Sequence, residues 1–544
     1  MSRESAADLV LRAGATHTMD PAAPPTTALA VRAGEIVAVA GPGDEADLLA
    51  AWRGPDTTVL DEPGLTVLPA FVDTHNHLML AARNVLGVPV SRARNIAEFV
   101  QLIRERAALT PPGQWILTGA DWHELRLAER RMPTAAELDR ATGEHPVLAL
   151  RGGHNGVLNS AGLRLAGLGP DTPDLPGGFI ARDAAGHPTG WVQDAALEFA
   201  QHALPPLPAD ALAAGMAQAS AGYAAHGLGT VRDPAVTPAE WRSYQQAQED
   251  GQLAVRSHVM MMSTPTAINS AGSMAGYLDA LEAQGIRPGA GEGLLRLWGL
   301  KFVLDGGAEA AALTRPYLDR PDYSGDLLWE QGELASALAT CVRRGWPVGT
   351  HAFGDRAIAV LLAAVREVVE RTGPIPPGLL VIEHAGLIGA ELIGEAVRLG
   401  LHLTVQQALL DGLAEPLTAA WGAERTAGLF PLRQLEDAGA WFSAGTDHPI
   451  GPLDPLRGVH GMTTRHTPAG LLGPRHAIGR AEALRRYTVA GAQLLGGGAT
   501  GTLVPGAPAD LTAYPADPFT VPVDELLSLA PTLTVIGGRI AHLA

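Results

Sequence analysis

Apolar, strand-forming runs alternate with helical stretches through the middle of this chain, and this alternation constrains the fold more than any other feature. Segments such as 357–371 and 388–399 have the length and composition of helices. Strands that alternate with helices pair in parallel, and eight such units predict an α/β fold, a (β/α)8 TIM barrel. The predicted barrel strands cover residues 67–73, 228–232, 255–262, 297–303, 346–350, 379–383, 401–405 and 441–444.

Both ends of the chain instead contain short apolar runs separated by Gly, Pro and Asp, which indicate strands and tight turns. We expect residues 1–65 and 495–544 to form one composite β-sandwich domain, and residues 66–494 to form the barrel. This central block is longer than the roughly 250 residues typical of such barrels, so it must contain an insertion. The gap after the first strand predicts an insertion at about residues 85–215, which would cover the active-site mouth.

Bulk composition excludes several partners. The net charge is −18, and an acidic surface repels phosphate backbones, so we expect no nucleic-acid partner. The single cysteine, Cys341, cannot form an internal disulfide and is typical of a reducing compartment. No apolar run approaches the ~18 residues of a membrane span, and the N-terminus lacks the pattern of a signal peptide. We therefore expect a cytoplasmic protein with no membrane partner, and leave a homodimer open.

Polar side chains end several of the predicted barrel strands. His75 and His77 follow the first strand, and residues two apart in a strand point to the same side. His351, His384 and Asp447 end the fifth, sixth and eighth strands. Active sites of these barrels lie at the carboxyl ends of the strands, and imidazole and carboxylate groups bind divalent metals. The pattern predicts a metal site at this end of the barrel.

Lys301, near the end of the fourth strand, is the only lysine among 39 basic residues. In an apolar setting a lysine can lose its proton and become a nucleophile, whereas arginine stays charged. One interpretation is that Lys301 reacts with carbon dioxide to form a carbamate, which bridges a pair of cations ~3.5–4 Å apart. Such a pair of cations would help to generate hydroxide from water. The other reading is a strand-end lysine that extends to solvent. In the first reading His75, His77 and Asp447 hold one cation and the remaining two histidines the other, with Asp447 also moving the proton.

Taken in order, these stretches resemble the amidohydrolase superfamily, and within it amidohydrolase family 3, over nearly the whole chain. The matching segments are residues 7–11, 68–78, 132–134, 137–139, 151–161, 301–307, 351–358, 382–388, 445–465 and 501–510. The resemblance implies a metal-dependent barrel with a composite β-sandwich that hydrolyses a carbon–nitrogen bond in amides, N-acyl compounds or formamides. It implies zinc, two ions per chain, with manganese, iron or cobalt as alternatives. The implied ligands are His75, His77, Lys301, His351, His384 and Asp447.

Three further residues are candidates for contact with a small amide-type substrate. Trp122 and His154 lie in the predicted insertion, and His448 directly follows Asp447 at a position that varies in the family. Two of them have an ordinary alternative: Trp122 could be a core residue, and His448 a surface loop residue.

Other functions remain open at this stage. A mononuclear deaminase of the same superfamily would hold about one metal per chain. An aldolase-type enzyme would use Lys301 as a Schiff-base nucleophile, which borohydride trapping would detect. A metal-binding protein with a decayed site would hydrolyse no amide.

Overall fold

The computed structural model describes residues 6–173, 175, 177–497 and 500–544. Within them, eight parallel strands form the central sheet in the order β17-β16-β15-β14-β13-β12-β11-β5. The edges meet where the Thr74 amide donates to the Ala444 carbonyl (3.1 Å), so the sheet nearly closes into a barrel. Its strands are β5 (Phe71–Asp73), β11 (Leu228–Val236), β12 (Arg256–Met262), β13 (Leu295–Val303), β14 (Val348–Ala352), β15 (Leu380–His384), β16 (His402–Val405) and β17 (Trp441–Ala444).

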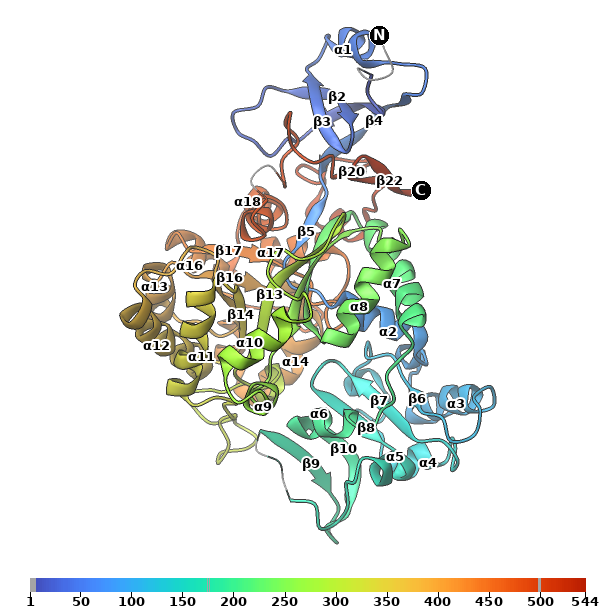
Figure 1. Ribbon diagram of the computed structural model, residues 1–544, viewed down its shortest axis with the longest axis vertical. Coiled ribbons are helices and arrows are strands. Elements are labelled where there is room, and N and C mark those ends of the chain that lie inside the picture. Colours follow the sequence, from blue (N-terminus) through green and yellow to red (C-terminus); the bar gives the residue numbers. More distant parts are fainter. Residues whose placement is uncertain (1–5, 174, 176, 498–499) are drawn as a thin grey trace.

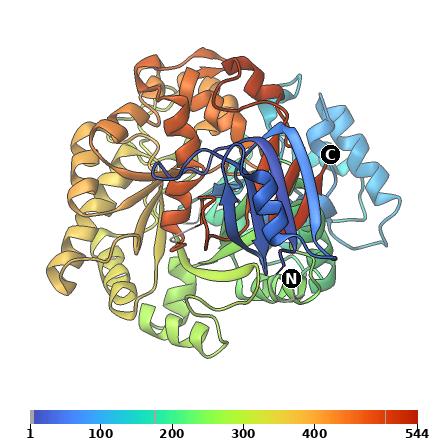
Figure 2. The ribbon, with the colours of Figure 1, turned by 90° about the horizontal axis from the view of Figure 1, so that it is seen from above.

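Helices surround this sheet. The helices from the later part of the barrel are yellow and orange in Figure 2. Helix α8 begins after a capping box in which the Thr237 and Glu240 side chains each bond the other's amide, and α11 ends at Gly345 with φ +69°. The main barrel helices are α2 (Leu78–Leu86), α7 (Ala209–Ala224), α8 (Pro238–Glu249), α10 (Met274–Glu282), α11 (Gln331–Arg344), α12 (Asp355–Thr372), α13 (Ala390–Arg398), α14 (Leu410–Trp421), α16 (Leu432–Asp437), α17 (Pro455–Thr464), α18 (Arg480–Arg486) and α19 (Val489–Leu494).

All eight predicted barrel strands are present, but the first is shorter than predicted. Residues 67–69 belong to another strand, β4 (Thr58–Pro69), and only Phe71–Asp73 pairs with β11. The chain passes between the two sheets at Ala70, whose amide donates to the Asp510 carbonyl (3.0 Å). The single apolar run 67–73 therefore contains two strands.

Strands from both ends of the chain form one further sheet, hydrogen-bonded continuously in the order β22-β21-β20-β4-β1-β2-β3. Its core includes Leu11, Val31, Val67, Leu511 and Val535, all buried. The sheet lies at the top of Figure 1, at the amino ends of the barrel strands. Besides β4, its strands are β1 (Leu9–Thr16), β2 (Thr26–Arg32), β3 (Glu35–Ala40), β20 (Leu511–Tyr514), β21 (Leu533–Ile536) and β22 (Arg539–Leu543).

The insertion after β5 lies at the opposite end of the barrel, at the bottom of Figure 1. Its sheet has the order β6-β7-β8-β10-β9. The insertion's elements are α3 (Ile96–Ala107), β6 (Ile116–Leu117), α4 (Ala135–Asp139), β7 (Val147–Arg151), β8 (Asn155–Leu158), α5 (Ser160–Leu165), β9 (Gly178–Arg182), β10 (Pro188–Asp194) and α6 (Ala195–Gln201). Its loops reach the carboxyl ends of the barrel strands.

In the part of the chain that the structure describes, no helix has the length and apolar character needed to cross a membrane.

Candidate active site

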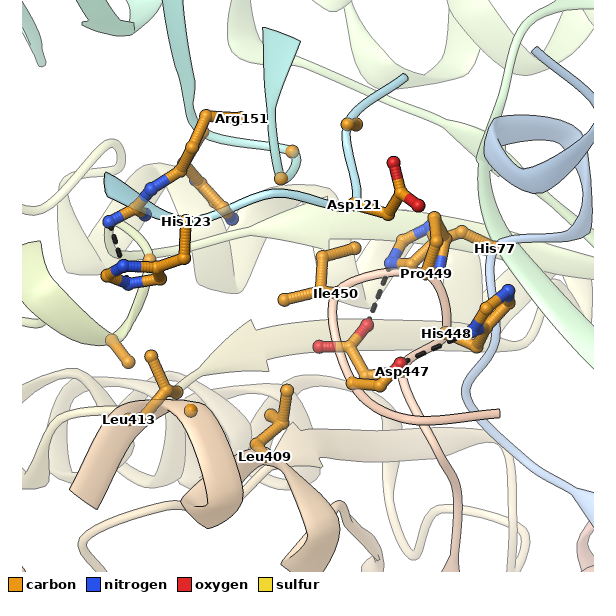
Figure 3. Close-up of a pocket in the computed structure, with 18 of the residues that line it drawn as sticks. His77, Asp121, His123, Arg151, Leu409, Leu413, Asp447, His448, Pro449 and Ile450 are labelled. Atoms are coloured by element: carbon orange, nitrogen blue, oxygen red, sulfur yellow. Dashed lines mark hydrogen bonds and ion pairs between the residues drawn. The ribbon is translucent and has the colours of Figure 1, made fainter. Parts of the chain in front are cut away.

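A cavity of about 790 Å³ lies at the carboxyl ends of the barrel strands. Barrel loops form its floor and one wall, and the insertion loops 120–126 and 151–155 form the other wall (Figure 3). All nine residues predicted for the site line this cavity: His75, His77, Trp122, His154, Lys301, His351, His384, Asp447 and His448.

His75, His77 and Asp447 converge at one point on the cavity floor. Asp447 Oδ1 lies 3.0 Å from His77 Nε2 and 3.5 Å from His75 Nε2. The ligand atoms of the three residues all lie within 4.8 Å of one another. Asp447 Oδ1 is buried and has no hydrogen-bond donor among the described residues. An orphaned carboxylate oxygen between two imidazole nitrogens fits a divalent cation.

His384 and His351 continue this cluster. The His384 ring lies 4.5 Å from the His75 ring and 4.5 Å from the His351 ring, between centroids. His384 Nδ1 contacts Gln406 Oε1 (2.8 Å), and His351 Nε2 contacts the Gly306 carbonyl (3.1 Å). A carbonyl can only accept, so His351 donates from Nε2 and its Nδ1 keeps the lone pair.

Three of the imidazoles are held in their neutral form. Burial lowers the pKa of His75, His351 and His384 well below 6.5, and positive neighbours such as Lys301 lower each of them further. Neutral imidazole is the form that binds metals. Burial also lowers the pKa of Lys301 to about 8, while the charges of Glu383 and Asp447 oppose this shift. A neutral amine is thus more accessible here than on an ordinary lysine.

The backbone at these residues is unusual. His384 (φ +73°), Ala385 (φ +47°) and Asp447 (φ +56°) adopt left-handed conformations without being glycine. The Asp447 amide donates to the His75 carbonyl (2.8 Å), which ties the eighth strand end to the first. Such conformations are costly and are typical of functional sites.

Buried charged residues that the sequence did not single out hold the histidines in place. Glu383 accepts from His75 Nδ1 (2.6 Å) and from Arg232. Asp73 accepts from the Thr446 amide (2.9 Å), and burial raises its pKa to about 6. Asp305 accepts from backbone amides after β14, and burial raises its pKa to about 7. Their only sequence signal was proximity to the strand-end motifs.

The predicted substrate-contact residues differ in how freely they face the cavity. Trp122 is mostly a core residue: its indole N–H donates to the Leu150 carbonyl, and its ring packs against Phe99 (4.8 Å between centroids). His154 Nδ1 contacts Asp194 Oδ1 (2.7 Å), and Asp194 raises the pKa of His154 against the effect of burial. His448 Nδ1 contacts the Gly451 carbonyl (3.3 Å), and burial lowers the pKa of His448 to about 4.

Another charged cluster lies at the insertion end of the cavity. Arg151 donates to Glu124 through Nε (2.8 Å) and Nη2 (2.7 Å), and Nη2 also reaches Glu309 (2.8 Å) and His123 (3.1 Å). Arg151 is buried, and this network links β7 of the insertion to the loop after β13. Figure 3 shows Arg151 and His123 across the cavity from Asp447.

The sequence profile of the amidohydrolase family matches residues 58–542. This chain is a member of the amidohydrolase family. An N-substituted formamide deformylase from Arthrobacter pascens is 29% identical over 553 residues, covering 98% of each chain. A solved structure of an uncharacterized metal-dependent hydrolase from Pyrococcus horikoshii is 25% identical, with a TM-score of 0.75 over 95% of this chain and 99% of the other. An adenosine deaminase from Xanthomonas campestris with bound zinc shares the fold at 14% identity, with a TM-score of 0.56 over 99% and 94%. This amidohydrolase is thus a metal-dependent hydrolase of the superfamily.

Proposed function

We propose that this amidohydrolase cleaves the carbon–nitrogen bond of a small amide-type compound, an N-acyl or N-formyl amine. The observation that carries the proposal is the gathering of four imidazoles, one carboxylate and one buried amine in a single cavity. Support also comes from the similarity to the N-substituted formamide deformylase, which extends over 98% of both chains.

The residues fit a pair of divalent cations, with zinc as the first candidate. His75, His77 and Asp447 would hold one, and His351 and His384 the other. Lys301 would add through its neutral amine to carbon dioxide, forming a nitrogen–carbon bond and releasing a proton, and the resulting carbamate would bridge the pair. Bound cations would lower the pKa of water and polarise the substrate carbonyl.

Asp447 would move the proton. In the proposed reaction a water oxygen attacks the carbonyl carbon, and the Asp447 carboxylate accepts the proton that this water loses. As the carbon–nitrogen bond breaks, Asp447 donates that proton to the leaving nitrogen, so that an amine and a carboxylic acid result.

The walls of the cavity suit a substrate with an apolar substituent. Leu409, Leu413 and Ile450 line it between Asp447 and the Arg151 cluster, as Figure 3 shows. Burial of an aliphatic group against them would contribute about 0.8 kcal/mol per methylene.

Amine release from paired substrates tests the proposal. The zinc-loaded protein should release primary amine from N-alkyl formamides or the matched N-acetyl amines, and chelation should abolish turnover. Absence of amine release from every member of such a panel would contradict the proposal.

A mononuclear deaminase is the second candidate. The observation in its favour is that His75, His77 and Asp447 form a compact three-ligand cluster by themselves. It predicts about one metal per chain, and ammonia release from an amino-substituted heterocycle in place of amine release from amides.

A further inference from the structure

Two of the cluster histidines have chemically different partners behind them. His75 Nδ1 contacts the carboxylate of Glu383 (2.6 Å), whereas His384 Nδ1 contacts the neutral amide of Gln406 (2.8 Å). All four residues are buried, so water does not weaken the difference between a charged and a neutral partner.

Glu383 is fixed as an ionised acceptor. Arg232 donates to its Oε1, and Thr404 Oγ1 donates to its Oε2 (2.8 Å). With donors already on both oxygens, the carboxylate can only accept from His75 Nδ1. His75 therefore carries its proton on Nδ1 and presents the Nε2 lone pair toward Asp447, 3.5 Å away.

Arg232 and a nearby glycine leave Glu383 little freedom. The Arg232 guanidinium lies 4.5 Å above the Trp298 ring, and its Nε donates to the Thr74 carbonyl (2.7 Å). A Cβ at Gly349 would overlap Glu383 Oε1, so any side chain there would displace the carboxylate. The charge behind His75 is thus held by three barrel strands.

Gln406 orients His384 without adding charge. Its Nε2 donates to Thr404 Oγ1 (3.1 Å), which turns its Oε1 toward His384 Nδ1. His384 therefore also presents Nε2, but with a neutral amide behind it. A carboxylate behind a metal-binding imidazole raises its basicity, and loss of such a partner costs about 10–100-fold in metal affinity.

We propose that Glu383 is a positioning residue that makes the His75–His77–Asp447 end the tighter of two cation sites, so that this end fills first. Gln406 leaves the His351–His384 end weaker. This inference rests on the proposed function, because it presumes that both ends bind a cation.

Zinc titration of the metal-free protein against a chromophoric chelator tests this inference without any substrate. The wild-type chain should show two dissociation constants. Glu383→Gln should weaken the tighter one by about 10–100-fold and leave the other nearly unchanged. Ser443→Ala is the matched control, because Ser443 is a buried polar residue that bonds Thr74 and His402 but none of the four cluster histidines.

A second variant keeps the test decisive if Glu383→Gln does not fold, which circular dichroism of the metal-free protein would reveal. Gln406→Glu should tighten the weaker site and narrow the gap between the two constants. Equal weakening of both sites by Glu383→Gln, or no effect of either variant, would overturn the role of Glu383. A wild-type chain that binds no zinc would instead contradict the proposed function itself.

Discussion

The two ends of the cavity are built in opposite ways. At the barrel end, imidazoles, a buried amine and a carboxylate lie at strand ends that backbone hydrogen bonds hold in register. At the insertion end, Arg151 is neutralised by Glu124 and Glu309, and the contacts join side chains from different loops. Side chains whose polar atoms lack a partner can bind a metal or a substrate. Charged side chains that are paired with one another instead stabilise the wall of the cavity. We therefore propose that the reaction takes place at the barrel end and that the insertion end selects the substrate.

The substitution Asp447→Asn, at the barrel end, should have the largest effect on activity. An amide cannot accept the water proton, so kcat should fall by roughly 10²–10⁴-fold. The assay is amine release by the zinc-loaded variant. Asp121→Asn is the control, because Asp121 lines the same cavity from the insertion side. Equal losses in both variants would remove the distinction between the two ends.

Lys301→Arg should remove the carbamate while keeping a positive charge, since arginine cannot become a neutral amine. The expected result is loss of turnover and of about one cation per chain, because the carbamate would bridge the pair. Elemental analysis of the purified variant measures the cation content. An unchanged metal content would argue against a bridging role for Lys301.

Arg151→Met should act on stability. Removing one partner of a buried ion pair leaves uncompensated charge and costs about 3–5 kcal/mol, here on Glu124 and Glu309. Denaturant unfolding measures the change. Arg131→Met breaks a pair with Glu137 in which the arginine is 49% exposed, and should cost only about 0–1 kcal/mol. Similar losses in both would mean that the Arg151 network is no more than a surface contact.

On acidification, the site should release its metal at a lower pH than imidazoles with an ordinary pKa would. The pKa values of His75, His351 and His384 lie well below 6.5 in the folded chain, so protons begin to compete with metal only below that pH. Metal content after equilibration should be flat from about pH 8 to about pH 6 and fall at lower pH. A fall centred on pH 6.5 would show that burial does not shift these groups.

Trp122→Phe should have the smallest effect. It removes the indole N–H that donates to the Leu150 carbonyl and leaves that acceptor unpaired, at a cost of about 1 kcal/mol. Thermal unfolding measures this, and kcat should stay near that of the wild type. A large fall in kcat would show that Trp122 takes part in the reaction and does not only form part of the cavity wall.

Much of the architecture could be predicted from the sequence because the barrel strands are apolar and regularly spaced, and because a polar group ends several of them. The first strand was placed too early because the run 67–73 is apolar throughout, and composition cannot reveal that the chain changes sheet at Ala70. The pairing of Arg232 with Glu383 was missed because it joins residues 151 positions apart across the barrel, where no local pattern marks it.

Anomalous diffraction from crystals of the zinc-loaded protein tests the central claim most directly. The account predicts a zinc peak in contact with His75, His77 and Asp447, a neighbouring peak at His351 and His384, and density extending beyond Lys301 Nζ. Zinc bound only elsewhere, with these side chains in contact with no cation, would contradict it.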